Sequence, residues 1–269
     1  MSDIGLAVER LVEIMRKLRA PGGCPWDREQ DLKSLRPYLI EEAYEVLEEM
    51  DKVAEGAPWE SLKEELGDLL FQIVFHAQLA KEQSEFDLAG VANAIADKLE
   101  RRHPHVFGDG KASNSTQVLE NWAKLKAKER KEKNGHVGSV LDGVPRDAPG
   151  LQRAERLTEK ASRIGFDWPD VSGVIAKVDE EVAELKEAMA SNDKAALEHE
   201  LGDVLFALAN LGRHLGIAPE DAMRAANRRF TTRFHHVEKG LEAQGVAFGE
   251  ATLAQMDALW DEAKAAEKA

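Results

Sequence analysis

The sequence contains one module twice, and this repeat constrains the fold more than any other feature. The second copy repeats an ELGD-x-LF core, the acidic segment before it and a tryptophan after it, all in the same order. The matched pairs are 41–45 with 180–184, 63–80 with 198–216, and Trp122 with Trp260. Because several matches in one order are not expected by chance, we infer two tandem copies of one structural unit.

The repeat divides the chain into two domains of similar length. Residues 134–150, rich in glycine and proline, have the composition of a linker. We therefore predict an N-terminal domain at 1–133 and a C-terminal domain at 151–269.

An all-α fold is predicted for both copies. Ala, Leu, Glu and Lys are abundant and aromatic residues reach only 6%, a composition that favours helices. The spacing of a packed helix occurs in each copy. Its apolar residues are Leu62, Leu66, Leu69, Leu70, Ile73 and Val74, and then Leu197, Leu201, Val204, Leu205, Leu208 and Ala209.

Each module should contain four helices joined by short connections. The first two are expected near 37–53 and 62–80, the third ends before Pro104, and the fourth carries Trp122. A capping box is predicted at Ser61-x-x-Glu64, where the second helix begins.

Composition also limits the partners. A formal charge of −14 argues against binding to a nucleic-acid backbone, which requires a basic face. The single cysteine, Cys24, cannot form an internal disulfide, and no apolar run reaches membrane-spanning length. We expect a soluble, cytoplasmic protein without nucleic-acid or membrane partners.

Pairs of carboxylates three residues apart mark the two central helices of each copy. In the second copy these are Glu181 with Glu184 and Glu200 with Asp203. Each pair projects from one side of its helix, so two antiparallel helices would bring all four together. Partly buried carboxylates repel one another unless a cation neutralises them, and oxygen-only ligands suit Mg²⁺ or Mn²⁺.

The acidic residues could instead be ordinary solvent-exposed charges that bind no metal. Acidic helix faces are usually just solvated, and for either pair alone that explanation is favoured. The recurrence of both pairs at matching phase in the two copies favours a site. Arg229 and Arg233, one turn apart on the next helix, could bridge phosphates or form ordinary salt bridges to the same acids, and Trp260 could stack on a base or fill the core.

The order EExxE, ExxD and a basic helix, twice in tandem, resembles the MazG nucleoside triphosphate pyrophosphohydrolases. GCPWDREQ, KLERRHPHVFGD and ELGDVLFALANLGRHLG carry the resemblance, which covers nearly the whole chain. It implies an all-α homodimer that uses Mg²⁺ to convert NTPs and dNTPs into monophosphates and pyrophosphate with broad base tolerance. The implied role is removal of aberrant or excess nucleotides.

The resemblance also implies site residues. The metal ligands would be Glu181, Glu184, Glu200 and Asp203, and the nucleotide contacts Lys177, Asn227, Arg229, Arg233 and Trp260. Glu180, Glu181 and Glu200 are the expected catalytic residues, with Glu180 the candidate base. The candidate degenerate first-copy site comprises Glu42, Glu45, Glu65, Asp68, Lys98 and Arg102.

The second copy is expected to be the active one. The first copy has Tyr38 where Lys177 stands and Ala96 where Asn227 stands, while the second has Ala196 where a basic residue is expected. In the expected reaction, metal-activated water attacks the α-phosphorus and pyrophosphate leaves.

Two alternatives from other classes stay open. One is a non-catalytic helical interaction protein whose acidic faces bind basic partners. The other is a di-iron carboxylate bundle, which would need two Glu-x-x-His motifs; only Glu100-x-x-His103 is a candidate, and its second-copy counterpart lacks the histidine.

Overall fold

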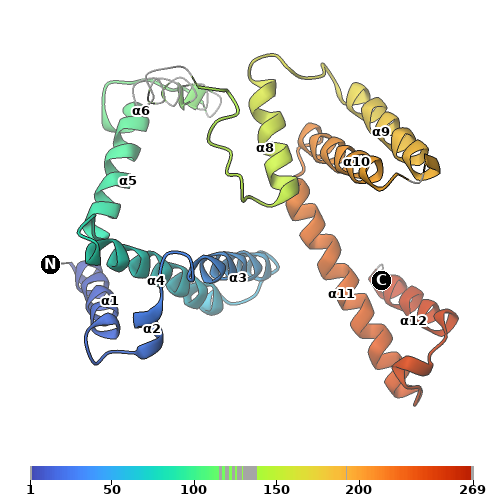
Figure 1. The fold of residues 1–269 in the computed structure, drawn as a ribbon, viewed down its shortest axis with the longest axis horizontal. Coiled ribbons are helices and arrows are strands. Elements are labelled where there is room, and N and C mark those ends of the chain that lie inside the picture. The colour runs from blue at the N-terminus through green and yellow to red at the C-terminus, as the bar shows by residue number, and fades with distance from the viewer. Residues whose placement is uncertain are drawn as a thin grey trace. The chain divides into compact units, whose positions relative to one another are not determined.

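The fold is helical in both copies. The computed structural model describes residues 2–114, 117, 118, 121, 122, 125, 129, 138–191 and 193–267, and none of these lies in a β-strand. They fall into two compact units, 1–129 and 130–269, coloured blue to green and yellow to red in Figure 1. The all-α prediction is confirmed, whereas the exact domain and linker boundaries stay predictions because residues 130–137 lie outside the described part.

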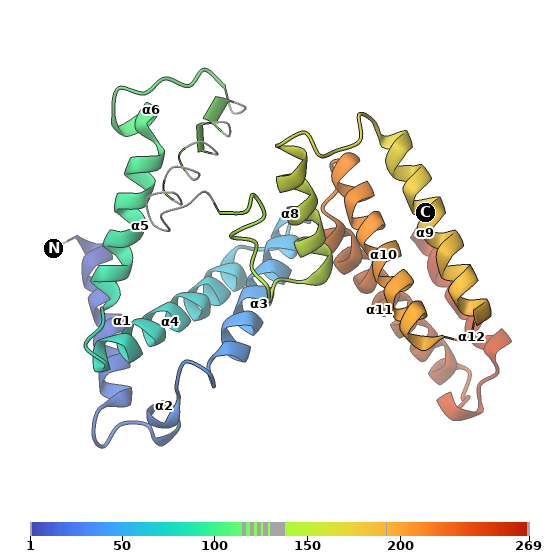
Figure 2. The ribbon, with the colours of Figure 1, turned by 45° about the horizontal axis from the view of Figure 1, so that its top comes forward.

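The first unit is built around a pair of long helices, α3 and α4, which run side by side in Figures 1 and 2. The shorter α1 packs across α4. The elements of this unit are α1 (Asp3–Arg19), α2 (Pro25–Glu29), α3 (Arg36–Ala54), α4 (Glu60–Glu82), α5 (Leu88–Arg102) and α6 (Pro104–Phe107).

The second unit repeats this plan. α9 pairs with α10 as α3 pairs with α4, and α8 packs on α10 as α1 packs on α4. The elements are α8 (Gly150–Ser162), α9 (Val171–Ser191), α10 (Lys194–His214), α11 (Pro219–Ala243), the 3₁₀ turn η1 (Phe248–Glu250) and α12 (Leu253–Ala266). The expected helices are present, except that the helix expected around Trp122 lies largely outside the described residues. The helices α1 and α8 add a leading helix to each unit that the four-helix prediction did not include.

Local sequence explains where most of these helices begin. Proline stands in the first turn of α3 and α11, where its missing N–H costs no hydrogen bond. The Asp193 side chain caps α10, and Thr252 with Gln255 forms a capping box on α12. The capping box predicted at Ser61 is wrong, because α4 already begins at Glu60 and its first residues have no side-chain cap.

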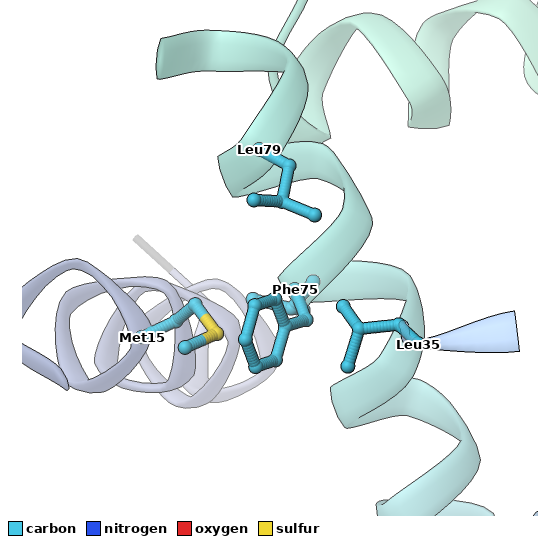
Figure 3. Packing of buried hydrophobic residues seen from close by; sticks show 5 residues of the cluster. Met15, Leu35, Phe75 and Leu79 are labelled. Atoms are coloured by element: carbon cyan, nitrogen blue, oxygen red, sulfur yellow. The ribbon is translucent and has the colours of Figure 1, made fainter. Parts of the chain in front are cut away.

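The hydrophobic core of the first unit lies where α1 crosses α4. Figure 3 shows Phe75 of α4 between Met15 of α1 and Leu35, with Leu79 one turn further along. Phe75 is 1% exposed and its ring also lies under the Arg19 guanidinium, 5.5 Å away. This packing holds α4 in place and thereby positions the acidic residues on its other half.

The apolar stripes on α4 and α10 are only partly covered. Leu62, Val74 and Val204 are buried as predicted, but three positions of the stripe in each copy are 40–50% exposed. These exposed residues are Leu66, Leu70 and Ile73 on α4, and Leu201, Leu205 and Leu208 on α10. Each set has i, i+4, i+7 spacing and therefore forms a continuous apolar face.

No described helix is long and apolar enough to cross a membrane.

Replacing Phe75 with alanine should destabilise the first unit by about 3–5 kcal/mol, because it removes a fully buried ring and leaves a cavity. Equilibrium urea unfolding measures this change. Phe86→Ala is the matched control, since Phe86 is 54% exposed and its loss should cost much less. Equal losses in the two variants would contradict the assignment of the core.

Candidate metal and phosphate site

The antiparallel pair α9 and α10 positions the acidic residues of the second copy. α9 ends at Ser191 and α10 begins at Lys194, so a very short connection reverses the chain and the two helices run side by side (Figure 2). Each helix places its acids on the face toward the other helix, as the three-residue spacing predicts.

Three carboxylates meet between these helices. Oxygen atoms of Glu181, Glu184 and Glu200 all lie within 4.8 Å of one another. Glu181 is buried, Glu200 is half-buried and Glu184 is exposed. Desolvation, followed by the charges of Glu181 and Glu200, raises the pKa of the Glu184 carboxyl above its usual value. The cluster therefore concentrates negative charge that a cation would relieve.

Lys177 supplies part of that positive charge. Its ammonium donates to Glu180 Oε1 and Glu181 Oε1, each at 2.8 Å, and these contacts raise the pKa of the lysine. The buried Glu181 thus has a cationic partner within the chain. Glu180, the predicted base candidate, is exposed and contacts the same lysine.

Asp203, the fourth predicted ligand, lies beside Glu200 but outside the group of three. It shares a contact with His199, whose Nδ1 is 3.1 Å from Asp203 Oδ2 and 3.3 Å from Glu200 Oε1. Sequence analysis missed His199. Alignment of the two copies could have found it, because His199 replaces Glu64 directly before the shared E-L-G-D motif and so marks a difference between the two sites.

The predicted nucleotide-contacting residues of α11 and α12 form a separate group. Arg233 pairs with Glu267, its Nη2 2.6 Å from Oε2, and its guanidinium lies 5.6 Å from the Trp260 ring. Asn227 and Arg229 are exposed on α11. Trp260 packs against the small core of the second unit, so the core-filling interpretation of this residue holds within one chain.

The expectation that these cations face the acidic cluster is not met within one chain. In the described residues, no ion pair joins Arg229 or Arg233 to Glu181, Glu184 or Glu200. The reason is the packing of α11, which contacts α10 only weakly and packs mainly on α12. A Cβ added at Gly240 would lie only 2.4 Å from Leu259 Cδ2, which shows how closely α11 and α12 approach each other.

The first copy repeats the acidic cluster without the lysine. Oxygen atoms of Glu42, Glu45 and Glu65 lie within 4.8 Å of one another. Burial is the largest effect that raises the pKa of Glu42 and of Glu65, and the charge of Asp68 contributes to both. Asp68 itself lies outside the group of three.

Gln72 replaces the lysine as the neighbour of the first-copy acids. Its Nε2 donates to Glu42 Oε1 at 3.4 Å, while its buried Oε1 has no hydrogen-bond partner in the described part of the chain. The second copy has Ala207 at this position. The two copies therefore surround similar acids with different polar groups, a difference that sequence analysis noticed only at Tyr38.

Among the described residues, the predicted first-copy basic residues form no ion pair with these acids. Arg102 pairs with Glu129 at 2.5 Å and, with Arg101, lowers the pKa of Glu129 to about 2. Lys98 is exposed on α5.

The Glu100-x-x-His103 motif does not form an iron site in the described residues. His103 Nδ1 lies 2.7 Å from the Leu99 carbonyl oxygen, and its ring packs edge-on against Trp122, with 5.0 Å between the ring centroids. It belongs to neither acidic cluster. The di-iron alternative is therefore not supported.

The second-copy cluster fits a hard divalent cation. Its donors are all carboxylate oxygens, they converge from two helices, and one of the three residues is buried while another is half-buried. Mg²⁺ is usually bound by a few carboxylates together with water and phosphate oxygens. The exposed side at Glu184 leaves room for those additional ligands.

Comparison with known proteins gives the same family for both copies. The model of the MazG nucleotide pyrophosphohydrolase domain matches residues 30–107 and 171–238. A nucleoside triphosphate pyrophosphohydrolase of Escherichia coli (strain K12) is 45% identical over 96% of this chain and 97% of its own length. The nucleoside triphosphate pyrophosphohydrolase/pyrophosphatase MazG of Thermotoga maritima is 44% identical over 98% of each chain. YabN of Bacillus subtilis is 42% identical over 95% of this chain but only 51% of its own length.

Replacing Lys177 with methionine should make the chain bind Mg²⁺ more tightly, because the ammonium competes with the ion for Glu181. Isothermal titration calorimetry of the nucleotide-free protein measures this affinity. Lys186→Met, on the exposed side of the same helix, is the control and should leave the affinity unchanged. Weaker or unchanged binding in Lys177→Met would show that the lysine does not compete for the site.

Proposed function

Because this chain belongs to the MazG nucleotide pyrophosphohydrolase family, we propose that it hydrolyses nucleoside and deoxynucleoside triphosphates to monophosphates and pyrophosphate with Mg²⁺ as cofactor. Mn²⁺ is a suitable substitute, since it accepts the same oxygen ligands. The observation that carries the proposal is the convergence of Glu181, Glu184 and Glu200 between two antiparallel helices.

In the proposed reaction, water attacks the α-phosphorus, the bond from that phosphorus to the bridging oxygen breaks, and pyrophosphate leaves with that oxygen. The divalent ion would polarise a phosphate oxygen and lower the pKa of the attacking water. Glu181, Glu184 and Glu200 would hold the ion, and Asp203 would support it from beside Glu200. Glu180 is the proposed base because it is close to the cluster, exposed and already held by Lys177.

Positive side chains stabilise the triphosphate in this proposal. Lys177 is next to the acids and can move from Glu181 to a phosphate once the ion has taken over the carboxylates. In this proposal Arg229 and Arg233 contact the phosphates, and Arg233 gives up its ion pair with Glu267 to do so. Trp260, next to Arg233, would stack on the base, a contact that tolerates every base and accounts for the proposed broad specificity.

The second copy is the proposed catalytic copy. It alone has Lys177 beside the acids, whereas Gln72 takes that place in the first copy. A broad pyrophosphohydrolase of this kind would act in the cytoplasm to remove aberrant or excess nucleotides. The non-catalytic interaction protein is the remaining alternative, and it predicts no pyrophosphate release with or without Mg²⁺.

Glu200→Gln should reduce pyrophosphate release by at least about 100-fold, since loss of a direct ligand should exceed the 10–100-fold effects of outer groups around metals. Glu65→Gln, the equivalent change in the first copy, should retain near-normal turnover. Steady-state pyrophosphate release from mixed NTPs with and without Mg²⁺ measures both variants. Equal losses would refute the division of labour between the copies.

We also propose that the chain forms a homodimer. The apolar face of Leu201, Leu205 and Leu208 is 43–50% exposed, and α4 carries the same pattern. A twofold dimer buries one surface against its own copy, so a single unpartnered stripe is sufficient to make the interface. The family resemblance and the recurrence of the stripe in both copies support a second copy of this chain as the partner.

Leu205→Glu should weaken the dimer by at least about tenfold, because burying an unpaired carboxylate costs several kcal/mol. Sedimentation equilibrium measures the effect. Leu253→Glu, at a position that is 70% exposed, should leave the dimer intact. A wild-type chain that stays monomeric at high concentration would contradict the proposal.

A further inference from the structure

His199 stands at the edge of the acidic cluster and is not used by the proposed reaction. It lies on α10 directly before Glu200 and one turn before Asp203, and its side chain is 73% exposed. The imidazole is nevertheless directed at the two carboxylates and not at solvent alone. Its Nδ1 lies 3.3 Å from Glu200 Oε1 and 3.1 Å from Asp203 Oδ2.

These separations suit a shared metal ion. Ligand atoms at about 2.1 Å from an octahedral ion lie about 3.0 Å apart along each edge of the octahedron. The two measured distances from Nδ1 are close to that edge length, and all three donor atoms of His199, Glu200 and Asp203 lie within 4.8 Å of one another. Small rotations of exposed side chains would complete one face of such an ion.

The group overlaps the first cluster at one residue. Glu200 belongs both to the all-oxygen group with Glu181 and Glu184 and to the group with His199 and Asp203. A carboxylate has two oxygens and can bridge two ions. The structure therefore offers two adjacent positions with different donor chemistry.

Comparison of the two copies identifies the imidazole as the distinguishing donor. The first copy has Glu64, Glu65 and Asp68 where the second has His199, Glu200 and Asp203, and in the described residues no histidine joins the first-copy cluster. Oxygen-only sets suit Mg²⁺, whereas an imidazole nitrogen favours transition-metal ions such as Co²⁺, Ni²⁺ and Zn²⁺ over Mg²⁺.

We propose that His199, Glu200 and Asp203 form a second divalent-cation position, which binds transition-metal ions through the His199 nitrogen. This position extends the proposed function, on which it rests through Glu200 and Asp203, the two residues that both positions share. It makes the second copy able to hold a transition-metal ion beside the magnesium position. The competing explanation is an imidazole that only donates a hydrogen bond to Asp203.

Spectroscopy of the full-length protein with Mn²⁺ alone tests the proposal. Electron spin-echo measurements should show modulation from a directly bound ¹⁴N nucleus in the wild type, and His199→Gln should abolish it. His235→Gln, which removes an exposed histidine of α11, should leave it unchanged. Absence of nitrogen modulation in the wild type, or its persistence in His199→Gln, would overturn the proposal and leave a hydrogen bond only.

Affinity measurements provide the second readout. Removal of one of three protein ligands should weaken Co²⁺ binding by about tenfold or more, while Mg²⁺ binding should change much less. His199→Glu, which installs the first-copy residue, should lose the nitrogen signal but keep Mg²⁺ binding. Equal changes for the two ions would contradict the proposal. Mg²⁺-dependent pyrophosphate release by the wild type is measured separately, so failure of the proposed function can be distinguished from failure of this site.

Discussion

The structure of the second unit depends on the close antiparallel contact between α9 and α10, which forces carboxylates of like charge together. Glu181, Glu184 and Glu200 could not remain within 4.8 Å of one another without compensation, because the buried Glu181 has little access to water. In the chain alone Lys177 provides that compensation. A divalent cation would therefore be able to replace the Lys177 ammonium as the partner of these carboxylates. The released ammonium could then contact a phosphate.

The two copies share one helical scaffold but place different polar groups beside their acidic clusters. Both hold three acids between paired helices, but the first copy surrounds them with a neutral amide, Gln72, and the second with an ammonium. Burial raises the pKa of Glu42 in the first copy without any described cation within ion-pairing distance. Duplication thus preserved the helices that position the acids and allowed the neighbouring residues to diverge.

Periodicity in the sequence was sufficient to predict the helices and the convergence of the acids, because both follow from helical geometry over one or two turns. It was not sufficient for contacts between helices distant in sequence. The predicted approach of Arg233 to the acids failed within one chain because α11 packs on α12 through Val237 and Leu259, which no local pattern specifies. The exposure of Leu205 and the orientation of His199 likewise depend on which surfaces remain uncovered after folding.

The central claim is that the acidic residues of α9 and α10 bind a divalent ion that also binds the phosphate oxygens of a nucleoside triphosphate. It is tested most directly by ³¹P relaxation of a non-hydrolysable NTP analogue bound to the protein with Mn²⁺. The account predicts strong paramagnetic relaxation of the phosphorus nuclei, with an ion-to-phosphorus distance of about 3–4 Å set by inner-sphere oxygens, and loss of this effect in Glu181→Gln. An analogue that binds equally well without a divalent ion, or whose phosphorus nuclei stay far from it, would contradict the account.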